Sequence, residues 1–311
     1  MLFKVSIKKP HNHELLADSG QKAALAAKPN RYQKEHHMEF KDKFIGFIDI
    51  LGFKNMVEVA EAGTGMALKE LLEALKHLGE PEDKEKFKKY GPTTCPQSQY
   101  LQRDLDFQLK QISDCVIVSS EVSPAGVINL VQHCWGAVIM LLTKGFMCRG
   151  YITRGLIYHT EDQVIGSGYQ KAYGKESHVT AFKRSADERG TPFVEVDQVI
   201  CDYIATYTDS CVKKMFSRYV KTDGEVTALF PFQRLSHSFV IGGFGLPPFD
   251  PEKERRSNHN VRIMLQNCKE QVVALVDKSN PNAMIKAEHY LAALDAQLEV
   301  CLKTDKFIAM L

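Results

Sequence analysis

Two aspartates at the ends of two apolar segments are the residues of this chain best suited to do chemistry. Asp49 lies in segment 44–53, FIGFIDILGF, and Asp114 lies in segment 109–118, LKQISDCVIV. An ionised carboxylate is costly to bury unless it is paired or binds a metal ion. Mg2+ and Mn2+ prefer oxygen ligands, commonly one or two carboxylates together with substrate phosphates. The pair therefore predicts one shared site for divalent cations.

A nucleoside triphosphate is the ligand that this arrangement favours. Two carboxylates can hold two cations about 4 Å apart, which act on the attacking and leaving oxygens of a displacement at phosphorus. Gly52 and Phe53 follow Asp49 and permit a tight turn into a helix, whose free backbone N–H groups can bind a polyphosphate. Taken singly, each aspartate could instead be a cap or a turn residue.

The apolar periodicities predict the elements that position these residues. Strands are expected at residues 44–51, 106–112, 115–120, 145–157, 164–165 and 193–196, and helices at 66–78, 126–143 and 169–184. Ser113 and Asp114 would form the tip of a hairpin. The order predicts an α+β fold, in which a mostly antiparallel sheet with a ferredoxin-like βαββαβ core carries helices on one face.

The rest of the chain is expected to form two extensions to a domain over residues 43–205. Residues 1–42 are polar and basic and predict an irregular N-terminal extension, and residues 79–100 predict a surface loop. Residues 206–311 predict a mainly helical C-terminal extension. Its expected elements, which begin just before it, are helices at 199–218, 260–277 and 282–302 and short strands near 225–243.

Composition excludes several classes of protein. The chain has 311 residues, 44% of them hydrophobic, and its 40 Lys and Arg against 38 Asp and Glu give a net charge of only +2. Bulk charge therefore does not indicate a nucleic-acid-binding protein. The eight cysteines form no C-x-x-C pair, which favours reduced thiols in a cytoplasmic protein. No signal peptide or membrane span is expected, because polar residues interrupt the longest apolar segment, 127–142.

Four motifs, in their order and spacing, resemble those of the class III nucleotidyl cyclases over residues 43–205. Segment 47–53, FIDILGF, resembles the first metal motif, and segment 110–114, KQISD, resembles the second. Segment 149–155, RGYITRG, resembles the strand whose arginine contacts the triphosphate. Segment 166–176, GSGYQKAYGKE, resembles the turn and helix that follow.

The resemblance implies attack of the ribose 3′-oxygen on the α-phosphorus, with diphosphate leaving. Asp49 and Asp114, with the backbone carbonyl of Ile50, would hold two Mn2+ or Mg2+ ions, and Arg149 would contact the triphosphate. Phe53 and Lys54 would lie at the phosphate turn. Phe53 is better explained as a packing residue, and Lys54 could equally be solvated.

Departures from the family pattern bear on the base and on catalysis. Ser167 stands where adenylate cyclases have an adenine-reading aspartate, which argues against ATP. Gln170, a candidate catalytic residue, replaces an asparagine and could still donate a hydrogen bond. Gly174 cannot replace the arginine that steadies the transition state. Positive charge must then come from elsewhere, or activity is weak or absent. The candidates are Arg149, Arg154, Lys171 and Lys175.

This combination resembles the pyrimidine cyclases of bacterial Pycsar anti-phage systems, which make cyclic UMP or cyclic CMP to activate a separate effector protein. Lys110 is the candidate base-reading residue. An ammonium donates but never accepts, so it favours the O4 acceptor of uracil and hence UTP, although it could reach O2 or N3 of cytosine in CTP. Lys110 could also be an ordinary surface lysine.

The resemblance further implies a head-to-tail homodimer with active sites at the subunit interface. One subunit would supply the metal-binding residues and the other would supply the base-reading residues. Two alternatives stay open: an adenylate or guanylate cyclase, and a degenerate cyclase-like domain that binds nucleotide or partner proteins without catalysis.

Overall fold

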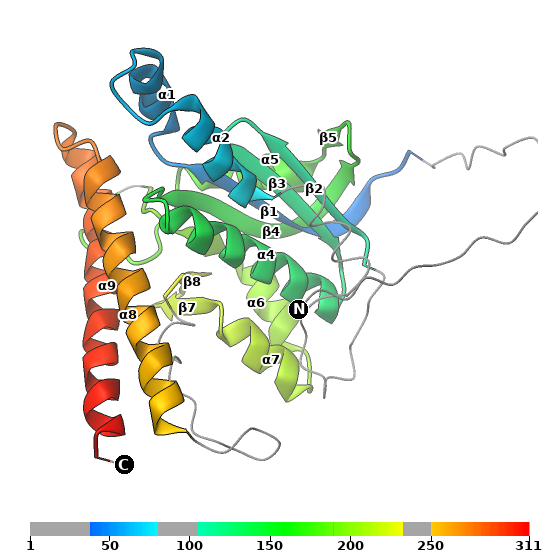
Figure 1. Ribbon diagram of the computed structural model, residues 1–311. Coiled ribbons are helices and arrows are strands. Elements are labelled where there is room, and N and C mark those ends of the chain that lie inside the picture. The colour runs from blue at the N-terminus through cyan, green and yellow to red at the C-terminus, as the bar shows by residue number, and fades with distance from the viewer. Residues whose placement is uncertain (1–37, 80–104, 189, 233–249, 311) are drawn as a thin grey trace, which may run out of the picture. The chain divides into compact units, whose positions relative to one another are not determined.

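An eight-stranded sheet forms the centre of the protein, in the order β2-β3-β1-β4-β6-β8-β7 with β5 paired to β4 (Figure 1). This computed structural model describes residues 38–79, 105–188, 190–232 and 250–310. Most of the expected N-terminal extension, nearly all of the expected loop at 79–100 and part of the expected strands near 225–243 lie outside these ranges. The strands are β1 (Lys41–Ile50), β2 (Phe107–Ile112), β3 (Cys115–Glu121), β4 (Cys148–His159), β5 (Val164–Ile165), β6 (Val194–Val196), β7 (Val220–Asp223) and β8 (Val226–Leu229).

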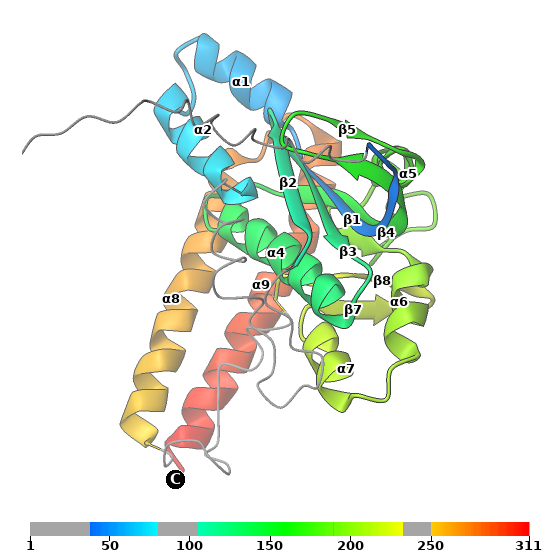
Figure 2. The same ribbon diagram turned by 90° about the vertical axis from the view of Figure 1, so that its right-hand side faces the viewer.

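Strand pairing is mostly antiparallel. The central strand β1 runs antiparallel to β3 and to β4, as Figure 2 lets the reader follow. The one parallel pair among the described strands is β4 with β6. The predicted α+β class and mostly antiparallel sheet are therefore confirmed.

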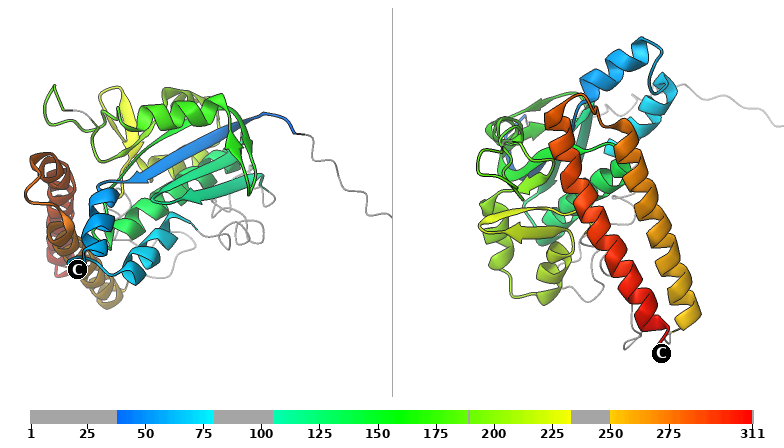
Figure 3. Two further views of the ribbon diagram at one scale, coloured as in Figure 1. Left: turned by 90° about the horizontal axis from the view of Figure 1, so that it is seen from above. Right: turned by 90° about the vertical axis from the view of Figure 1, so that its left-hand side faces the viewer.

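Helices cover both faces of the sheet, not one face as the sequence suggested. Phe44 and Ile48 of β1 pack in a core with α4 (Pro124–Leu142), whereas Ile45 and Phe47 pack in a separate core with α5 (Ser167–Glu176). Figure 3 shows the two helices on opposite sides of β1. Because successive side chains of a strand point to opposite faces, a strand that is apolar at consecutive positions must be covered twice.

Helix α4 is the central core helix on its face of the sheet. It is the one helix among the described residues that is long and apolar enough to cross a membrane, with a mean hydropathy of 1.6. The protein buries 67% of that apolar stretch in its interior, as in the core helix of a globular domain.

Two short helices precede α4, and two more follow β6. Helix α1 (Phe53–Glu61) follows β1, and α2 (Leu68–Leu75) continues into a short 3-10 turn, η1 (Lys76–Leu78). The expected helix at 199–218 is two helices, α6 (Gln198–Ala205) and α7 (Ser210–Ser217). Asp209 separates them, because its side chain accepts a hydrogen bond from the Cys211 N–H and thereby starts α7.

The C-terminal part combines two strands with a long helical hairpin. Strand β8 pairs with β6, so the sheet continues past residue 205. Helices α8 (Pro251–Leu275) and α9 (Pro281–Ile308) lie side by side (Figure 3) and pack against the end of α4. Each begins at a proline after a capping Asp250 or Asn280. The division into a catalytic domain and an extension near residue 205 stays a prediction.

Candidate functional site

The strand register places three functional side chains in one row. Asp49 lies opposite Cys115 of β3 on one side and opposite Arg149 of β4 on the other. Directly paired residues of antiparallel strands have neighbouring side chains on the same face. A carboxylate, a thiol and a guanidinium therefore share the end of the sheet at which β1 stops.

The hairpin between β2 and β3 brings Asp114 to this same end. Its two-residue loop is Ser113-Asp114, as predicted, and Ser113 has the positive φ of 54° that such a tight loop needs. The Ile50 N–H donates a hydrogen bond of 3.2 Å to the Asp114 carbonyl. This bond ties the last residue of β1 to the loop that carries the second aspartate.

The environment strongly disfavours ionisation of Asp49. Burial, followed by the negative charges of Asp114 and Glu176, raises the pKa of Asp49 to about 7, and the opposing effect of Arg149 is smaller. Burial and then the charges of Asp49, Asp114 and Glu176 raise the pKa of the Cys115 thiol to about 11. Cys115 therefore stays protonated, and a cation placed among these groups would relieve the repulsion.

Glu176 is a third carboxylate of the site, and the sequence did not single it out. It lies in the last turn of α5, is buried, and accepts a hydrogen bond of 2.5 Å from Arg149 Nε. Its charge holds Arg149 at the site while adding to the negative potential at Asp49. A glutamate in a polar helix end has no sequence signal that marks it as buried next to this row of side chains.

The oxygen atoms at this site fit a hard divalent cation that takes its remaining ligands from a substrate. Asp49 and Asp114 offer carboxylates. Ile50, which follows Asp49 and ends β1, offers a backbone carbonyl. Over the described ranges no group of three or more His, Cys, Asp or Glu side chains could hold a metal ion. Mg2+ and Mn2+ accept such a set, because water and phosphate oxygens commonly complete their coordination.

The turn after β1 leads directly into α1. Gly52 takes a φ of 75°, a left-handed conformation that glycine adopts without strain, and no side-chain hydrogen bond caps the helix. The Phe53 ring packs in the main core, and Lys54, whose side chain is 90% exposed, lies 3.7 Å from Glu58. Any phosphate contact of Phe53 would therefore use its backbone N–H.

Lys110 and Ser167, the candidate base-reading residues, and Gln170, a candidate catalytic residue, lie outside the row formed by Cys115, Asp49 and Arg149. Lys110 Nζ donates hydrogen bonds of 2.6 and 2.9 Å to the carbonyls of Glu161 and Asp162. Ser167 and Gln170 lie on the exposed side of α5. A Cβ on Gly155 would come within 2.9 Å of Gly168, next to Ser167. Gly155 is six residues beyond Arg149 on β4. At 3.3 Å per residue, the two residues are about 20 Å apart along the strand.

Two of the cations considered as substitutes for the missing arginine are held elsewhere. Asp42 binds Arg154 through contacts of 2.7 and 3.0 Å, near the start of β1. Asp197 binds Lys171 at 2.5 Å. A Cβ on Gly174 would meet no atom within 4 Å, so the position of the missing arginine is open.

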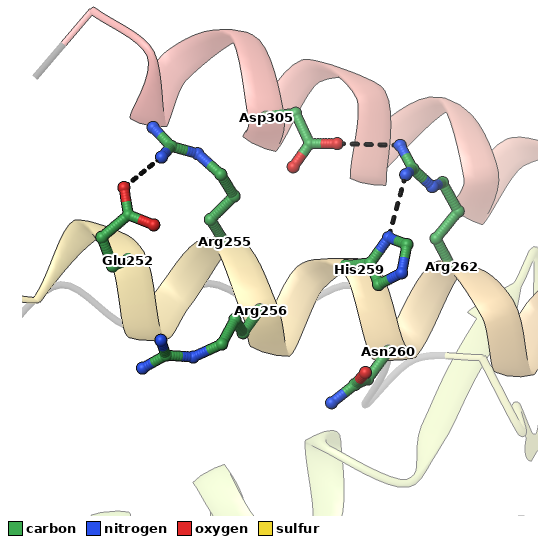
Figure 4. A pocket seen from close by; sticks show the side chains of 7 residues that line it. All are labelled: Glu252, Arg255, Arg256, His259, Asn260, Arg262 and Asp305. Carbon is green, nitrogen blue, oxygen red and sulfur yellow. Dashed lines mark hydrogen bonds and ion pairs between the residues drawn. The ribbon is translucent and has the colours of Figure 1, made fainter.

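A separate hollow of about 570 Å³ lies on the C-terminal hairpin (Figure 4). Its lining includes three arginines, but Glu252 binds Arg255, and Asp305 binds Arg262 at 3.0 Å. Arg262 also contacts His259 at 3.1 Å. None of the residues that the sequence suggested for nucleotide or metal binding lines this hollow.

The chain was compared with protein families, curated proteins and solved structures. No protein-family model matches the chain. No curated protein matches it either. Among solved structures, it is similar to the catalytic core of a rhodopsin-guanylyl cyclase with converted specificity in complex with ATPαS. The identity is 13% and the TM-score is 0.31, over 54% of this chain and 83% of that one. At this TM-score and identity, the similarity does not indicate a function for this chain.

Proposed function

We propose that this protein is a nucleotidyl cyclase that converts UTP, or less readily CTP, into the 3′,5′-cyclic monophosphate and diphosphate. The observation that carries the proposal is the shared end of β1, β3 and β4. There burial, together with the charge of Asp114, raises the pKa of Asp49 to about 7, directly beside Arg149. Perturbed carboxylates next to an arginine are typical of a functional site.

The chemistry is an intramolecular displacement at phosphorus. The O3′–H bond breaks and its proton passes to water or to the departing diphosphate. The bond from O3′ to the α-phosphorus forms, and the bond from that phosphorus to the oxygen that bridges it to the β-phosphorus breaks. Asp49, Asp114 and the Ile50 carbonyl would hold two Mn2+ or Mg2+ ions. When bound, such ions supply charge that favours the ionised 3′-oxygen and neutralises the triphosphate.

The protein groups bind and orient the triphosphate. Arg149 would exchange its contact with Glu176 for the phosphate oxygens, where a guanidinium forms strong charged hydrogen bonds. The first N–H groups of α1, after Gly52, point out of a helix N-terminus and favour an anion. Most of the rate acceleration would come from positioning and charge stabilisation.

The base would be read by residues of a second copy of the chain. In a head-to-tail homodimer with two interface sites, Lys110 and Ser167 would read the base from the second subunit, and Gln170 would act in catalysis. Lys110 would donate to O4 of uracil, and it would have to leave the carbonyls of the turn before β5 to do so. We further propose that the cyclic nucleotide is a second messenger in antiviral defence, which acts on a separate effector protein in the cytoplasm.

Product analysis tests the proposal against its alternatives. The full chain is incubated with MnCl2 and each ribonucleoside triphosphate separately, and products are identified by mass spectrometry. Cyclic UMP is expected. A cyclic purine nucleotide would instead support an adenylate or guanylate cyclase. Absence of any cyclic product would support the non-catalytic domain, which the open position at Gly174 favours.

A further inference from the structure

Lys286 of α9 is a half-buried cation near the proposed triphosphate site. The charge of Arg149 repels its ammonium and the charges of Glu176 and Glu188 attract it, so these three charges are near enough to act on it. Arg149 and Glu176 are the ion pair already described next to Asp49. A lysine from the C-terminal hairpin is thus present at the end of the sheet that holds the row of functional side chains.

Neighbouring contacts fix this part of α9 in place. Tyr290, one helical turn after Lys286, is fully buried and donates a hydrogen bond of 3.5 Å to the carbonyl of Cys148, which precedes Arg149. Its ring stacks on Phe193 with a centroid distance of 5.8 Å. His289 Nε2 lies 2.6 Å from Glu188 Oε1. Lys286 is therefore presented by a helix whose docking leaves it little freedom to move away.

The hairpin also contacts the end of β1. Leu51, two residues after Asp49, packs against the apolar cluster that α8 and α9 form with the end of α4. A Cβ on Gly190 would lie 2.6 Å from an Arg149 guanidinium nitrogen, so Arg149 fills the space beside the loop that carries Glu188. These contacts place the first turns of α9, the loop and Arg149 in one region.

The ammonium of Lys286 lacks a close counter-ion among the residues that the structure describes. No ion pair within that part of the chain includes it, whereas Arg149 is paired with Glu176. Burial and then repulsion by Arg149 lower the pKa of Lys286. Two cations held near each other away from bulk water are stabilised when a multiply charged anion binds between them. A polyphosphate is such an anion.

We propose that Lys286 is a second triphosphate-binding cation, which the C-terminal hairpin presents beside Arg149. The identity of the anion as part of a nucleotide rests on the proposed function. The inference gives the C-terminal hairpin a role, because it supplies a side chain to the site. It also provides local positive charge that Arg154 and Lys171, both held by aspartates elsewhere, do not provide.

Calorimetric titration with inorganic tripolyphosphate tests the inference without requiring catalysis. The variants are Lys286→Gln and Lys286→Met, which remove the charge, and Lys286→Arg, which keeps it. Lys303→Gln, an exposed lysine farther along α9, is the matched control for net charge. Loss of one charged contact should weaken binding about tenfold or more in the two neutral variants. Lys286→Arg and Lys303→Gln should bind as the unmodified chain does.

Thermal melting of every variant separates lost binding from lost folding, and the methionine variant keeps the apolar stem if the glutamine variant unfolds. The inference is overturned if the unmodified chain does not bind tripolyphosphate. Equal affinity in the neutral variants, or equal weakening in Lys303→Gln, would also overturn it. Titration with diphosphate in parallel shows whether the site holds the leaving group as well as the intact triphosphate.

Turnover measured on the same variants keeps the two proposals apart. Weaker tripolyphosphate binding in a chain that cyclises no nucleotide would support the polyphosphate site and contradict the cyclase function. A chain that makes a cyclic nucleotide with an unchanged KM in Lys286→Gln would support the function and contradict the role of Lys286. If both proposals hold, Lys286→Gln raises KM for the triphosphate and Lys286→Arg restores it.

Discussion

Asp49 stands directly opposite Arg149 in the β1–β4 ladder. The guanidinium lowers the pKa of this carboxyl, but burial and the charges of Asp114 and Glu176 outweigh it. With a pKa of about 7, Asp49 is thus about half protonated at neutral pH when no cation is bound. We therefore expect the charges of this row to affect the stability of the protein and, if the proposed cation site exists, the pH at which a cation binds.

Replacing Asp49 by asparagine should stabilise the cation-free protein at alkaline pH. The pKa of Asp49 is near 4 in the unfolded chain and about 7 in the folded one, so between these values the folded state binds more protons. The free energy of unfolding of the unmodified protein therefore falls as pH rises from 4 to 7 and then levels off. At pH 8 Asp49→Asn should be more stable by roughly 1–3 kcal/mol, given about 1.4 kcal/mol per pKa unit.

Urea unfolding in EDTA at pH 5 and pH 8 measures this difference. Asp223→Asn, an exposed aspartate on β7, is the control and should leave the pH dependence unchanged. An Asp49→Asn variant that loses stability between pH 5 and pH 8 as steeply as the unmodified chain would contradict the raised pKa.

Mn2+ should stabilise the protein more at pH 8 than at pH 6. A bound cation requires ionised carboxylates, and Asp49 gives up its proton only as pH rises through about 7. Asp114→Asn removes one proposed ligand and should lose most of the rise in melting temperature with added MnCl2. Differential scanning fluorimetry measures both effects. An Mn2+ effect equal at the two pH values, or equal in Asp114→Asn, would argue against this site.

Removing the charge of Glu176 should shift the pH at which Mn2+ binds. Glu176 raises the pKa of Asp49, so Glu176→Gln should lower that pKa and move half-maximal Mn2+ binding to a lower pH. Electron paramagnetic resonance of free Mn2+ follows the titration. Glu299→Gln, an exposed glutamate of α9, should not move the midpoint. A midpoint that stays fixed or rises in Glu176→Gln would show that Glu176 does not act on Asp49.

The sequence predicted the central strands and the hairpin loop well because their signals are local. Apolar runs at 44–51 and 115–120, with Ser113-Asp114 between two strands, correspond to β1, β3 and the observed loop. The helix expected at 169–184 ends at Glu176 instead. The helix expected at 260–277 begins earlier, at Pro251. Its first turns are polar, so only Asp250 and Pro251 indicate its start in the sequence.

The sequence did not indicate Glu176 or Lys286, because tertiary contacts bring both of them near Arg149. Glu176 is ten residues from Gly166 in the chain, and only the packing of α5 on β1 and β4 brings it to Arg149. Lys286 lies more than 130 residues from Arg149 in the sequence, and the docking of Tyr290 on the Cys148 carbonyl places it there. No local pattern predicts either pairing. Asp49 could be found because a carboxylate inside an apolar strand is unusual by itself. Asp114 could be found because it lies directly between two apolar strands.

Two inactive variants should restore activity when mixed, if the active sites lie between subunits. Asp49→Asn removes a metal-binding residue and Lys110→Ala removes the proposed base-reading residue. In a head-to-tail dimer each mixed pair has one intact site, so an equal mixture should recover about a quarter of the unmodified activity. A mixture as inactive as its components, although size-exclusion chromatography shows exchanged dimers, would place all these residues in one subunit's site.

The most direct test of the proposed cyclase activity is a competition among the four ribonucleoside triphosphates. The full chain is given an equimolar mixture of ATP, GTP, CTP and UTP with MnCl2, and the cyclic products are quantified by liquid chromatography and mass spectrometry. Asp49→Asn is the negative control. We expect cyclic UMP as the main product, a smaller amount of cyclic CMP, and none from Asp49→Asn. A cyclic purine nucleotide as the main product, no cyclic product, or equal product from Asp49→Asn would contradict the proposed function.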